Sequence, residues 1–329
     1  MNSFGRMFRV HIFGESHGEC VGLTIDGCPA GLSLSVDDFA ADVERRKPGA
    51  LGTTPRKEDD TPQIKTGLFN GKTTGAPITI IFENKNTRSS DYEMQRAVPR
   101  PGHADFVASK KFGGNEDYRG SGHFSGRLTV CLVAAGVIAK KTLKDIHVNA
   151  SITEIGGEAD TEKGLQKAFE AKDSVGGIVE CRVSGLPAGL GEPFFDSAES
   201  LISHAVFAIP AVRGVEFGTV FAAAKMFGSD HNDSIEDKTG KTFTNHAGGI
   251  VGGLTNGNEL VFRIAIKPTS STPKEQQTLN TETGNVVAFS VKGRHDLCIA
   301  LRVPVVLEAV TAMVLADLML LEQRIPRII

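Results

Sequence analysis

Residues 119–143 read RGSGHFSGRLTVCLVAAGVIAKKTL, and this stretch indicates the fold more clearly than any other part of the chain. Its second part, Arg127–Leu143, is rich in alanine and valine and ends near two lysines, Lys140 and Lys141. Apolar residues without a distinct polar face predict a largely buried helix, and lysines stabilise the carboxyl end of a helix. The sequence therefore predicts a core helix preceded by a glycine-rich loop.

The glycine-rich loop Arg119–Arg127 leads directly into this helix. Free backbone N–H groups and the positive end of the helix dipole would face the same point there, which favours an anion such as phosphate. No G-K-S/T sequence follows, so the loop is not a Walker A motif. A plain connecting loop is the alternative interpretation.

Other regular elements lie on both sides of this helix. Pro77–Glu83, Gly177–Ser184 and Glu259–Ile266 are rich in β-branched residues and predict strands. Within Gly177–Ser184, valine and cysteine alternate with charged residues, as expected for a strand with one buried face. Ala198–Ala208 and Val305–Gln323 predict two further helices.

A short internal repeat suggests how the chain is organised. The sequence GCPAGL at Gly27–Leu32 returns as GLPAGL at Gly185–Leu190, each time after a strand-like run. Turn chemistry alone can produce so short a match. The alternative is that two related α+β halves pack as one body. No proline- or serine-rich linker separates the halves, so we expect one compact domain spanning residues 1–329.

The composition argues against several classes of protein. The chain has a net charge of −3, no Trp and two Tyr, which argues against nucleic-acid binding through basic patches or aromatic stacking. It has five cysteines but no C-x-x-C pair and no H-x-x-x-H pattern, which argues against a disulfide framework and a metal site. The N-terminus has no apolar signal region, and charged residues interrupt the longest apolar stretches. We therefore expect a cytoplasmic protein that does not span a membrane.

Long polar, glycine-rich stretches interrupt the regular elements, and we expect them to form the walls of an active site. They are Arg45–Asp60, Glu83–Asp117, Gly228–Gly253 and Lys267–Gly284. Arginines gathered in glycine-rich loops, in a chain of nearly neutral charge, predict a small anionic ligand. These arginines are Arg45, Arg46, Arg88, Arg100, Arg119, Arg127 and Arg294.

Two histidines lie in glycine-containing turns, and an unperturbed pKa of about 6.5 suits histidine to proton transfer. His17 lies in the sequence GESHG, which matches G-x-S-x-G by letters. A strand-like run follows it, so the helix that a nucleophile elbow requires is missing. His103 lies in the sequence RPGHAD, where Asp105 could orient its ring. The alternative for GESHG is a turn with a hydrogen-bonded histidine, and the alternative for RPGHAD is a solvated turn.

Two further segments near the C-terminus carry polar groups. Lys267–Ser271 (KPTSS) combines a lysine with three hydroxyl groups, a set that suits phosphate. Gly293–Asp296 (GRHD) offers a planar arginine fork, a titratable imidazole and a carboxylate. A surface held by salt bridges is the alternative interpretation of both.

Taken together, these segments resemble the chorismate synthase family, and the resemblance runs through essentially the whole chain. Three long segments resemble the main motifs of the family: GESHGECVGLTIDGCP (Gly14–Pro29), GHFSGRLTVCLVAAGVI (Gly122–Ile138) and RHDLCIALRVPVVLEAV (Arg294–Val310). Three shorter ones also resemble family segments: RPGHAD (100–105), NHAGGIVGG (245–253) and KPTSS (267–271). The chain departs from the usual family residues at Leu297 and at His123-Phe124.

The resemblance implies a carbon–oxygen lyase that acts on a phosphate ester. The family converts 5-enolpyruvylshikimate-3-phosphate (EPSP) to chorismate and inorganic phosphate by a 1,4-anti elimination. This is the last common step of the shikimate pathway to the aromatic amino acids. The reaction needs reduced FMN although there is no net redox change, and NADPH is implied as an indirect reductant.

The resemblance also implies roles for individual residues. His17 would keep the reduced flavin in its protonation state, His103 would protonate the leaving phosphate, and Asp296 would assist proton removal near flavin N5. Ser16 and Ser125 would support that relay. The residues implied to bind cofactor are Arg46 (also linked to NADPH), His123, Phe124, Ser125, Pro210, Ala211, Gly252, Lys267, Pro268, Thr269, Ser270, Ser271 and Arg294. Our candidates for the carboxylates and phosphate of the substrate are Arg46, Arg100, Arg127 and Arg294.

The fold implied by the resemblance is α+β, a β-α-β sandwich of antiparallel sheets and helices with internal pseudo-symmetry, and the implied assembly is a homotetramer. Two other functions remain open on the residues alone. A flavin-dependent oxidoreductase would consume NADPH in proportion to its product. A non-catalytic anion- or RNA-binding module would show a salt-sensitive affinity for a polymer.

Overall fold

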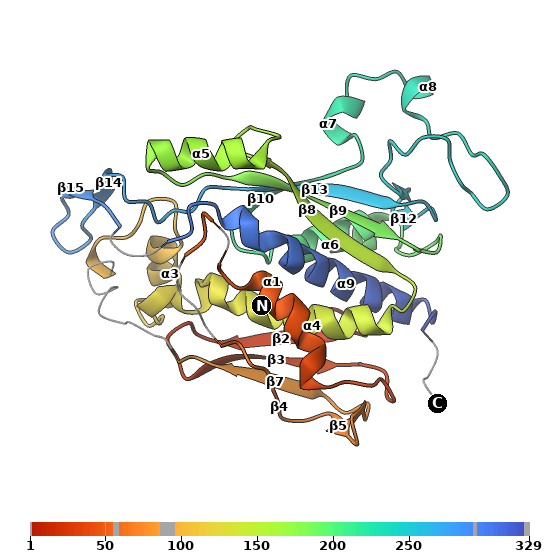
Figure 1. Ribbon diagram of the computed structural model, residues 1–329, viewed down its shortest axis with the longest axis horizontal. Helices are drawn as coiled ribbons and strands as arrows, with labels where there is room; N and C mark the ends of the chain where they lie inside the picture. Colours follow the sequence, from red (N-terminus) through yellow and green to blue (C-terminus); the bar gives the residue numbers. More distant parts are fainter. Residues whose placement is uncertain (1, 50, 55–58, 86–95, 292–294, 326–329) are drawn as a thin grey trace.

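Two antiparallel sheets enclose a central layer of helices (Figure 1). The structure, a computed structural model, describes residues 2–49, 51–54, 59–85, 96–291 and 295–325. The first sheet has the order β1-β2-β3-β7-β4, formed by Ser3–Phe4, Arg9–Gly14, Cys20–Asp26, Ile78–Glu83 and Gln63–Ile64. The second has the order β10-β13-β9-β8, formed by Val212–Phe217, Leu260–Ile266, Gly177–Ser184 and His147–Ile155.

Shorter elements complete the part of the chain that the structure describes. Three two-stranded ribbons pair β5 with β6, β11 with β12 and β14 with β15: Leu68–Phe69, Lys72–Thr73, Ile250–Val251, Leu254–Thr255, Gln276–Leu279 and Val286–Phe289. The α-helices are α1 Ala40–Arg46, α3 Asp105–Phe112, α4 Thr129–Thr142, α5 Thr161–Ala171, α6 Ala198–Val206, α7 Val220–Ala223, α8 Gly228–His231 and α9 Val303–Leu321. The 3-10 helices are η1 Val36–Phe39, η3 Arg119–Phe124, η4 Gly126–Leu128, η5 Phe194–Asp196 and η6 Ile299–Arg302.

Helices α4 and α9 form the centre of the core, between the two sheets (Figure 1). Their backbones approach closely at Gly136, where an added Cβ would lie 2.3 Å from Cβ of Ala309. Residues 119–142 and 299–321 are long and apolar enough to cross a membrane, yet 72% and 83% of their apolar windows are buried inside the protein. Their apolar composition is therefore accounted for by packing against the sheets and against each other.

The predicted elements agree closely with the structure. The strand predicted at Gly177–Ser184 is β9 with the same bounds, and Val179, Cys181 and Val183 are fully buried. The predicted core helix begins as α4 at Thr129, because the preceding turn is the 3-10 helix η4. Ser125 caps that turn, since its Oγ accepts a hydrogen bond from the N–H of Arg127 at 3.3 Å. The mixture of helices and antiparallel strands is an α+β fold.

The two GxPAGL segments have the same local geometry. In the first, Thr73 Oγ1 donates to the Pro29 carbonyl at 2.6 Å and accepts from the N–H of Leu32 at 2.9 Å. In the second, Thr255 Oγ1 donates to the Pro187 carbonyl at 2.7 Å and accepts from the N–H of Leu190 at 2.9 Å. The segments follow β3 and β9, and each threonine belongs to a two-residue strand. Shared turn residues alone do not require this common partner.

Candidate active site

Two adjoining cavities lie at the amino-terminal ends of α4 and η6. The first, of about 230 Å³, is lined by Arg46, Arg127 and Arg302 together with Ser16 and Asp296. The second, of about 420 Å³, is lined by the Lys267–Ser271 segment and by residues of the glycine-rich loop. Both include Ser125, Gly126, Thr129, Pro210, Thr269 and Ile299 in their walls. They therefore form one continuous cleft, large enough for a small-molecule ligand.

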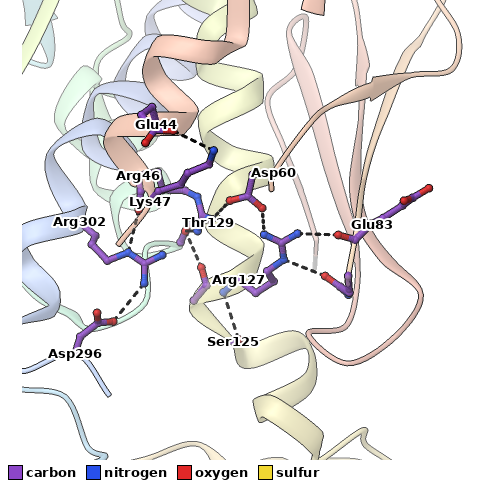
Figure 2. A network of polar contacts seen from close by, with 12 residues as sticks. Glu44, Arg46, Lys47, Asp60, Glu83, Ser125, Arg127, Thr129, Asp296 and Arg302 are labelled. Carbon is purple, nitrogen blue, oxygen red and sulfur yellow. Dashed lines mark hydrogen bonds and ion pairs between the residues drawn. The ribbon is translucent and has the colours of Figure 1, made fainter. Parts of the chain in front are cut away.

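The first cavity has a strongly cationic wall (Figure 2). The Asp60 carboxylate receives a hydrogen bond from Arg46 Nη2 on one oxygen and from Arg127 Nη1 on the other. Arg127 Nε also donates to Asn84 Oδ1 at 2.9 Å, and Arg46 Nη1 donates to Thr129 Oγ1 at 3.3 Å. Two arginines share one carboxylate, so this part of the wall keeps a net positive charge.

Arg46 is the most deeply buried of these cations, with a side chain only 3% exposed. Burial lowers its pKa to about 10; Asp60 opposes this shift, while the charges of Arg302 and Arg127 add to it. At neutral pH Arg46 still carries its charge. Its Nε is buried and has no hydrogen-bond partner among the residues that the structure describes. A buried donor without a partner is costly.

Asp296 lies at the same cavity, held by Thr54, which is distant in the sequence, and by the nearby Arg302. Its Oδ1 accepts from the N–H of Thr54 at 2.8 Å, and Arg302 Nη1 donates to its Oδ2 at 3.3 Å. Arg302 Nε also donates to the carbonyl of Arg46 at 3.0 Å (Figure 2). Arg302 is not among the residues predicted from the sequence. The sequence did contain a signal for it, because Arg302 is the one charged residue in the apolar run between Asp296 and Glu308.

Ser16 and His17 lie in the turn after β2, close to the glycine-rich loop. Ser16 is 1% exposed, and its N–H donates to the carbonyl of Gly122 at 3.1 Å. The His17 ring lies under Gly120, where an added Cβ would be 2.3 Å from Cδ2 of His17. Only glycine at position 120, with a φ of +57°, lets the loop cover the imidazole this closely. Ser16 lines the first cavity, whereas His17 lines neither cavity.

His103 lies at the edge of the second cavity in a network of polar contacts. Its Nδ1 lies 2.6 Å from Asp105 Oδ1 and 3.1 Å from Arg100 Nη2. The predicted contact between Asp105 and this ring is confirmed. Burial would raise the pKa of Asp105, but hydrogen bonds from Arg100 and His103 hold it well below its usual range. The carboxylate therefore stays ionised and orients the imidazole.

The guanidinium group of Arg100 is hydrogen-bonded to several other side chains of the protein. Its Nε donates to Asp105 Oδ2 at 2.8 Å, its Nη1 to Ser271 Oγ at 3.1 Å and its Nη2 to Ser121 Oγ at 2.9 Å. Ser121 has a φ of +68° between two glycines of the loop. Arg100 thereby ties the RPGHAD turn to the glycine-rich loop and to the KPTSS segment. Its predicted contact with substrate stays a prediction.

Most residues predicted to bind cofactor meet in the second cavity. Its walls include His123, Phe124, Ser125, Pro210, Ala211, Lys267, Thr269, Ser270 and Ser271. Arg46 lines the first cavity instead, and Gly252 and Pro268 line neither. Gly252 lies in the turn of the β11–β12 ribbon, in the predicted wall segment Gly228–Gly253, and no residue of that segment lines the two cavities. Arg294 and Arg88 lie outside the described residues.

The second cavity also presents polar groups suited to a phosphate. Lys267 Nζ donates to Ser270 Oγ at 2.7 Å, and burial lowers the pKa of Lys267 with a further contribution from Arg213. The Thr269 hydroxyl is buried and has no hydrogen-bond partner within the described ranges. His123 is committed to the fold, since its Nδ1 contacts the carbonyl of Gly14 at 2.8 Å.

Comparisons with known proteins identify the family. The family model described as chorismate synthase matches residues 8–320. The chain is 70% identical over 329 residues to the chorismate synthase of Chitinophaga pinensis, covering 100% of this chain and 99% of that protein. It is 43% identical over 365 residues to that of Methanocaldococcus jannaschii, covering 97% of this chain and 96% of that protein.

A solved structure agrees with the sequence comparisons. The crystal structure of a chorismate synthase superposes with a TM-score of 0.73 at 25% identity, covering 97% of this chain and 93% of that chain. Both the sequence matches and the fold extend over nearly the full length. The chain belongs to the chorismate synthase family.

Proposed function

We propose that the cleft binds EPSP in the first cavity and reduced FMN in the second, side by side. As a member of the family, the chain is a lyase of the shikimate pathway that eliminates phosphate from EPSP to form chorismate. The observation that carries the proposal is the joining of two different cavities through shared walls. One has a cationic wall for an anionic substrate, and the other has hydroxyl groups and a lysine for a phosphate.

The second cavity fits the flavin on its own chemistry. The Thr269 hydroxyl lacks a partner among the described residues, and Lys267 and Ser270 lie beside it in the same wall. Phe124 is 42% exposed and offers an apolar surface at the same place. We propose that these residues, with His123, Ser125, Pro210, Ala211 and Ser271, hold FMN. When bound there, reduced flavin would supply the electron density that assists departure of phosphate, and NADPH would serve as the indirect reductant that first reduces the flavin.

We propose that residues on both sides of the cleft bind the substrate and move its protons, with Arg46, Arg127 and Asp296 in the first cavity and His103 at the edge of the second. Arg46 and Arg127 contact the carboxylates or phosphate of EPSP, since a guanidinium matches such groups in two places. His103, oriented by Asp105, gives a proton to the phosphate as its bond to C3 breaks. Asp296 assists removal of the proton from C6. Ser16 and Ser125 would support that relay, His17 would keep the reduced flavin in its protonation state, and the roles of Arg100 and Arg294 at the substrate are retained as proposals.

The test is an anaerobic assay of EPSP with photoreduced FMN, following chorismate and phosphate. We expect turnover with reduced FMN, no turnover with oxidised FMN, and no consumption of reduced flavin. This result separates a lyase from an oxidoreductase, because net hydride transfer would oxidise one flavin for each product. Stoichiometric flavin oxidation under strict anaerobiosis would contradict the proposal.

The role of His103 is tested by His103→Ala. Loss of a positioned acid should lower kcat by about 10²–10⁴-fold. The variant should fold, because the ring is partly exposed beside a turn. His147→Ala, which removes an exposed ring on β8, is the matched control and should keep the kcat of wild type. An unchanged kcat for His103→Ala between pH 6 and 8, roughly the range in which histidine titrates, would contradict the assignment.

We also propose that the chain forms a homotetramer of single-domain subunits in the cytoplasm, without nucleic-acid or membrane partners. Five phenylalanines between residues 194 and 243 are at least 70% exposed: Phe194, Phe195, Phe221, Phe227 and Phe243. Monomers rarely leave so much apolar surface in water, so a second copy is the occupant that we propose. Phe221→Asp together with Phe227→Asp should lower the mass measured by light scattering. An unchanged mass would exclude this region as the interface.

Internal pseudo-symmetry is the last part of the proposal. The matched threonine contacts of the two GxPAGL segments support it. So does the order of the strands, because β2-β3-β7-β4 in one sheet corresponds to β8-β9-β13-β10 in the other. Gly27 and Gly185 have φ values of +84° and +83°, and Gly31 and Gly189 have +90° and +94°. Each half then supplies one sheet and one central helix.

A further inference from the structure

Asp60 lies where two arginines of the first cavity meet. Its carboxylate has no exposed surface, and the side chains of Arg46 and Arg127 are only 3% and 5% exposed. One oxygen accepts from Arg46 Nη2 and the other from Arg127 Nη1 (Figure 2). The two arginines line the cavity, whereas Asp60 lies behind them. A single carboxylate therefore holds two guanidinium groups, one on each oxygen.

The surrounding protein fixes the two arginines from other sides as well. Arg127 Nε donates to Asn84 Oδ1 at 2.9 Å, and its Nη2 to the carbonyl of Glu83 at 3.3 Å. Arg46 Nη1 donates to Thr129 Oγ1 at 3.3 Å. Two cations placed this close repel each other, and the carboxylate between them offsets that repulsion. The carboxylate is thus the group that lets both arginines face one cavity.

Asp60 acts on an anionic ligand in two opposite ways. Its negative charge weakens the attraction between the cavity and the ligand. Its hydrogen bonds hold both arginine forks in place before the ligand arrives, which removes an ordering cost from binding. Because both oxygens are turned toward arginines and away from the cavity, we expect the positioning effect to be the larger one.

We propose that Asp60 is a positioning residue that holds Arg46 and Arg127 together as one anion-binding pair for EPSP. The inference rests on the proposed function, in which these two arginines contact the substrate. Asp60 itself does not contact the substrate in this proposal. If Asp60 positions the two arginines, removing its negative charge should weaken the binding of an anion. Simple electrostatics predicts the reverse, because the lost charge would have repelled the anion.

The first test is Asp60→Asn, which keeps the shape of the side chain and removes its charge. EPSP binding is measured by equilibrium dialysis against the complex with oxidised FMN, where no turnover is expected. We expect the Kd for EPSP to rise about tenfold, the scale of one lost charge-assisted hydrogen bond. A Kd equal to or below that of wild type would overturn the proposal.

Asp60→Glu provides an independent variant, because it keeps the charge and moves the carboxylate by one methylene. Positioning predicts a higher Kd for EPSP, and a counter-charge role alone predicts the Kd of wild type, which would overturn the proposal. Far-UV circular dichroism checks the folding of both variants. Asp60 has a φ of +53°, which asparagine adopts readily, so Asp60→Asn should fold and decides the question.

Two controls complete the design. Glu308→Gln changes another carboxylate that is 3% exposed and shared by two cations, Arg45 and Lys140, but lies outside the cavity. Its Kd for EPSP should equal that of wild type, and a rise as large as that of Asp60→Asn would attribute the effect to general destabilisation and overturn the proposal.

Arg46→Met and Arg127→Met separate this inference from the proposed function. If both variants bind EPSP as wild type does, the assignment of these arginines to the substrate is wrong, and the role of Asp60 fails with it. If both weaken binding while Asp60→Asn does not, the substrate assignment stands and the Asp60 inference alone fails.

Discussion

Arg45 and Arg46 are neighbours at the end of α1, yet they belong to two different clusters. Arg46 shares the carboxylate of Asp60 with Arg127 in the wall of the cleft. Arg45 shares the carboxylate of Glu308 with Lys140, with Arg45 Nη2 at 2.7 Å from Oε1 and Lys140 Nζ at 2.8 Å from Oε2. In each cluster two cations share one buried carboxylate. Of these two, the Asp60 cluster has its cations facing an open cavity.

The two arginines differ in the state of their charge. Arg45 is 46% exposed, and hydrogen bonds to Glu308 raise its pKa above the ordinary value. Arg46 is 3% exposed, and burial lowers its pKa to about 10. Hydrogen bonds within the protein favour the charged form of Arg45, whereas burial disfavours the charged form of Arg46. The Glu308 cluster joins α1, α4, α9 and β8, and the Asp60 cluster is available to a ligand.

The largest expected effect separates these neighbours directly. Arg46→Met leaves Arg127 on Asp60 but removes a buried cation from a carboxylate with no exposed surface, so the free energy of unfolding should fall by about 3 kcal/mol, the lower end of the range for a broken buried pair. Arg45→Met leaves Lys140 on Glu308 and removes a half-exposed partner, so the loss should be about 1–2 kcal/mol. Urea unfolding followed by far-UV circular dichroism measures both, because the chain has no Trp. Equal losses of unfolding free energy in Arg46→Met and Arg45→Met would mean that the difference in burial does not distinguish the two clusters.

The second prediction concerns the planar fork of Arg127. Arg127→Lys keeps the charge but cannot reach Asp60 and Asn84 together, and it cannot grip a ligand in two places. EPSP binding should weaken by about 1–3 kcal/mol, while FMN affinity in the absence of EPSP changes much less. Titration of EPSP into the FMN complex measures the difference. Equal EPSP affinity would reduce Arg127 to a point charge or a structural residue.

A third prediction tests the other cluster. Glu308→Gln should lower the free energy of unfolding by about 1–2 kcal/mol, because the amide cannot serve Arg45, Lys140 and the N–H of Ala150 as the carboxylate does. The KM for EPSP should stay at the wild-type value. A raised KM with normal stability would show that the Glu308 cluster also serves the site, and the contrast between the clusters would be lost.

The smallest expected effect is the pH dependence of the stability difference between wild type and Glu308→Gln. Burial would raise the pKa of Glu308, but hydrogen bonds from Arg45 and Lys140 hold it below its ordinary value of 4.5. A carboxylate whose pKa is lowered by folding stabilises the protein above its unfolded pKa and loses that contribution as pH falls through the folded pKa. The stability gap between wild type and Glu308→Gln should therefore narrow below about pH 4.3. A gap that widens in acid would mean that these hydrogen bonds do not lower the pKa of Glu308.

Much of the fold and part of the site could be predicted from the chain alone. The strand at Gly177–Ser184 and the helix after Arg127 follow from local alternation and local apolar content, which depend on neighbouring residues only. The grouping of Ser125, Lys267 and Thr269 around one cavity agrees with the motifs, although long stretches of chain separate them. In these regions, neighbouring residues are enough to specify the elements and the side chains available for chemistry.

Which charged residues work together follows from the packing of distant segments. Arg45 and Arg46 have the same chemistry, but successive residues point about 100° apart around a helix, so one meets Glu308 and the other Asp60. Arg302 and Asp60 join the site through partners distant in the sequence, and the Gly228–Gly253 segment, predicted as a wall, does not line the cleft of this chain. The pairing of charged side chains depends on how distant segments pack and exclude water, and no local pattern carries that information.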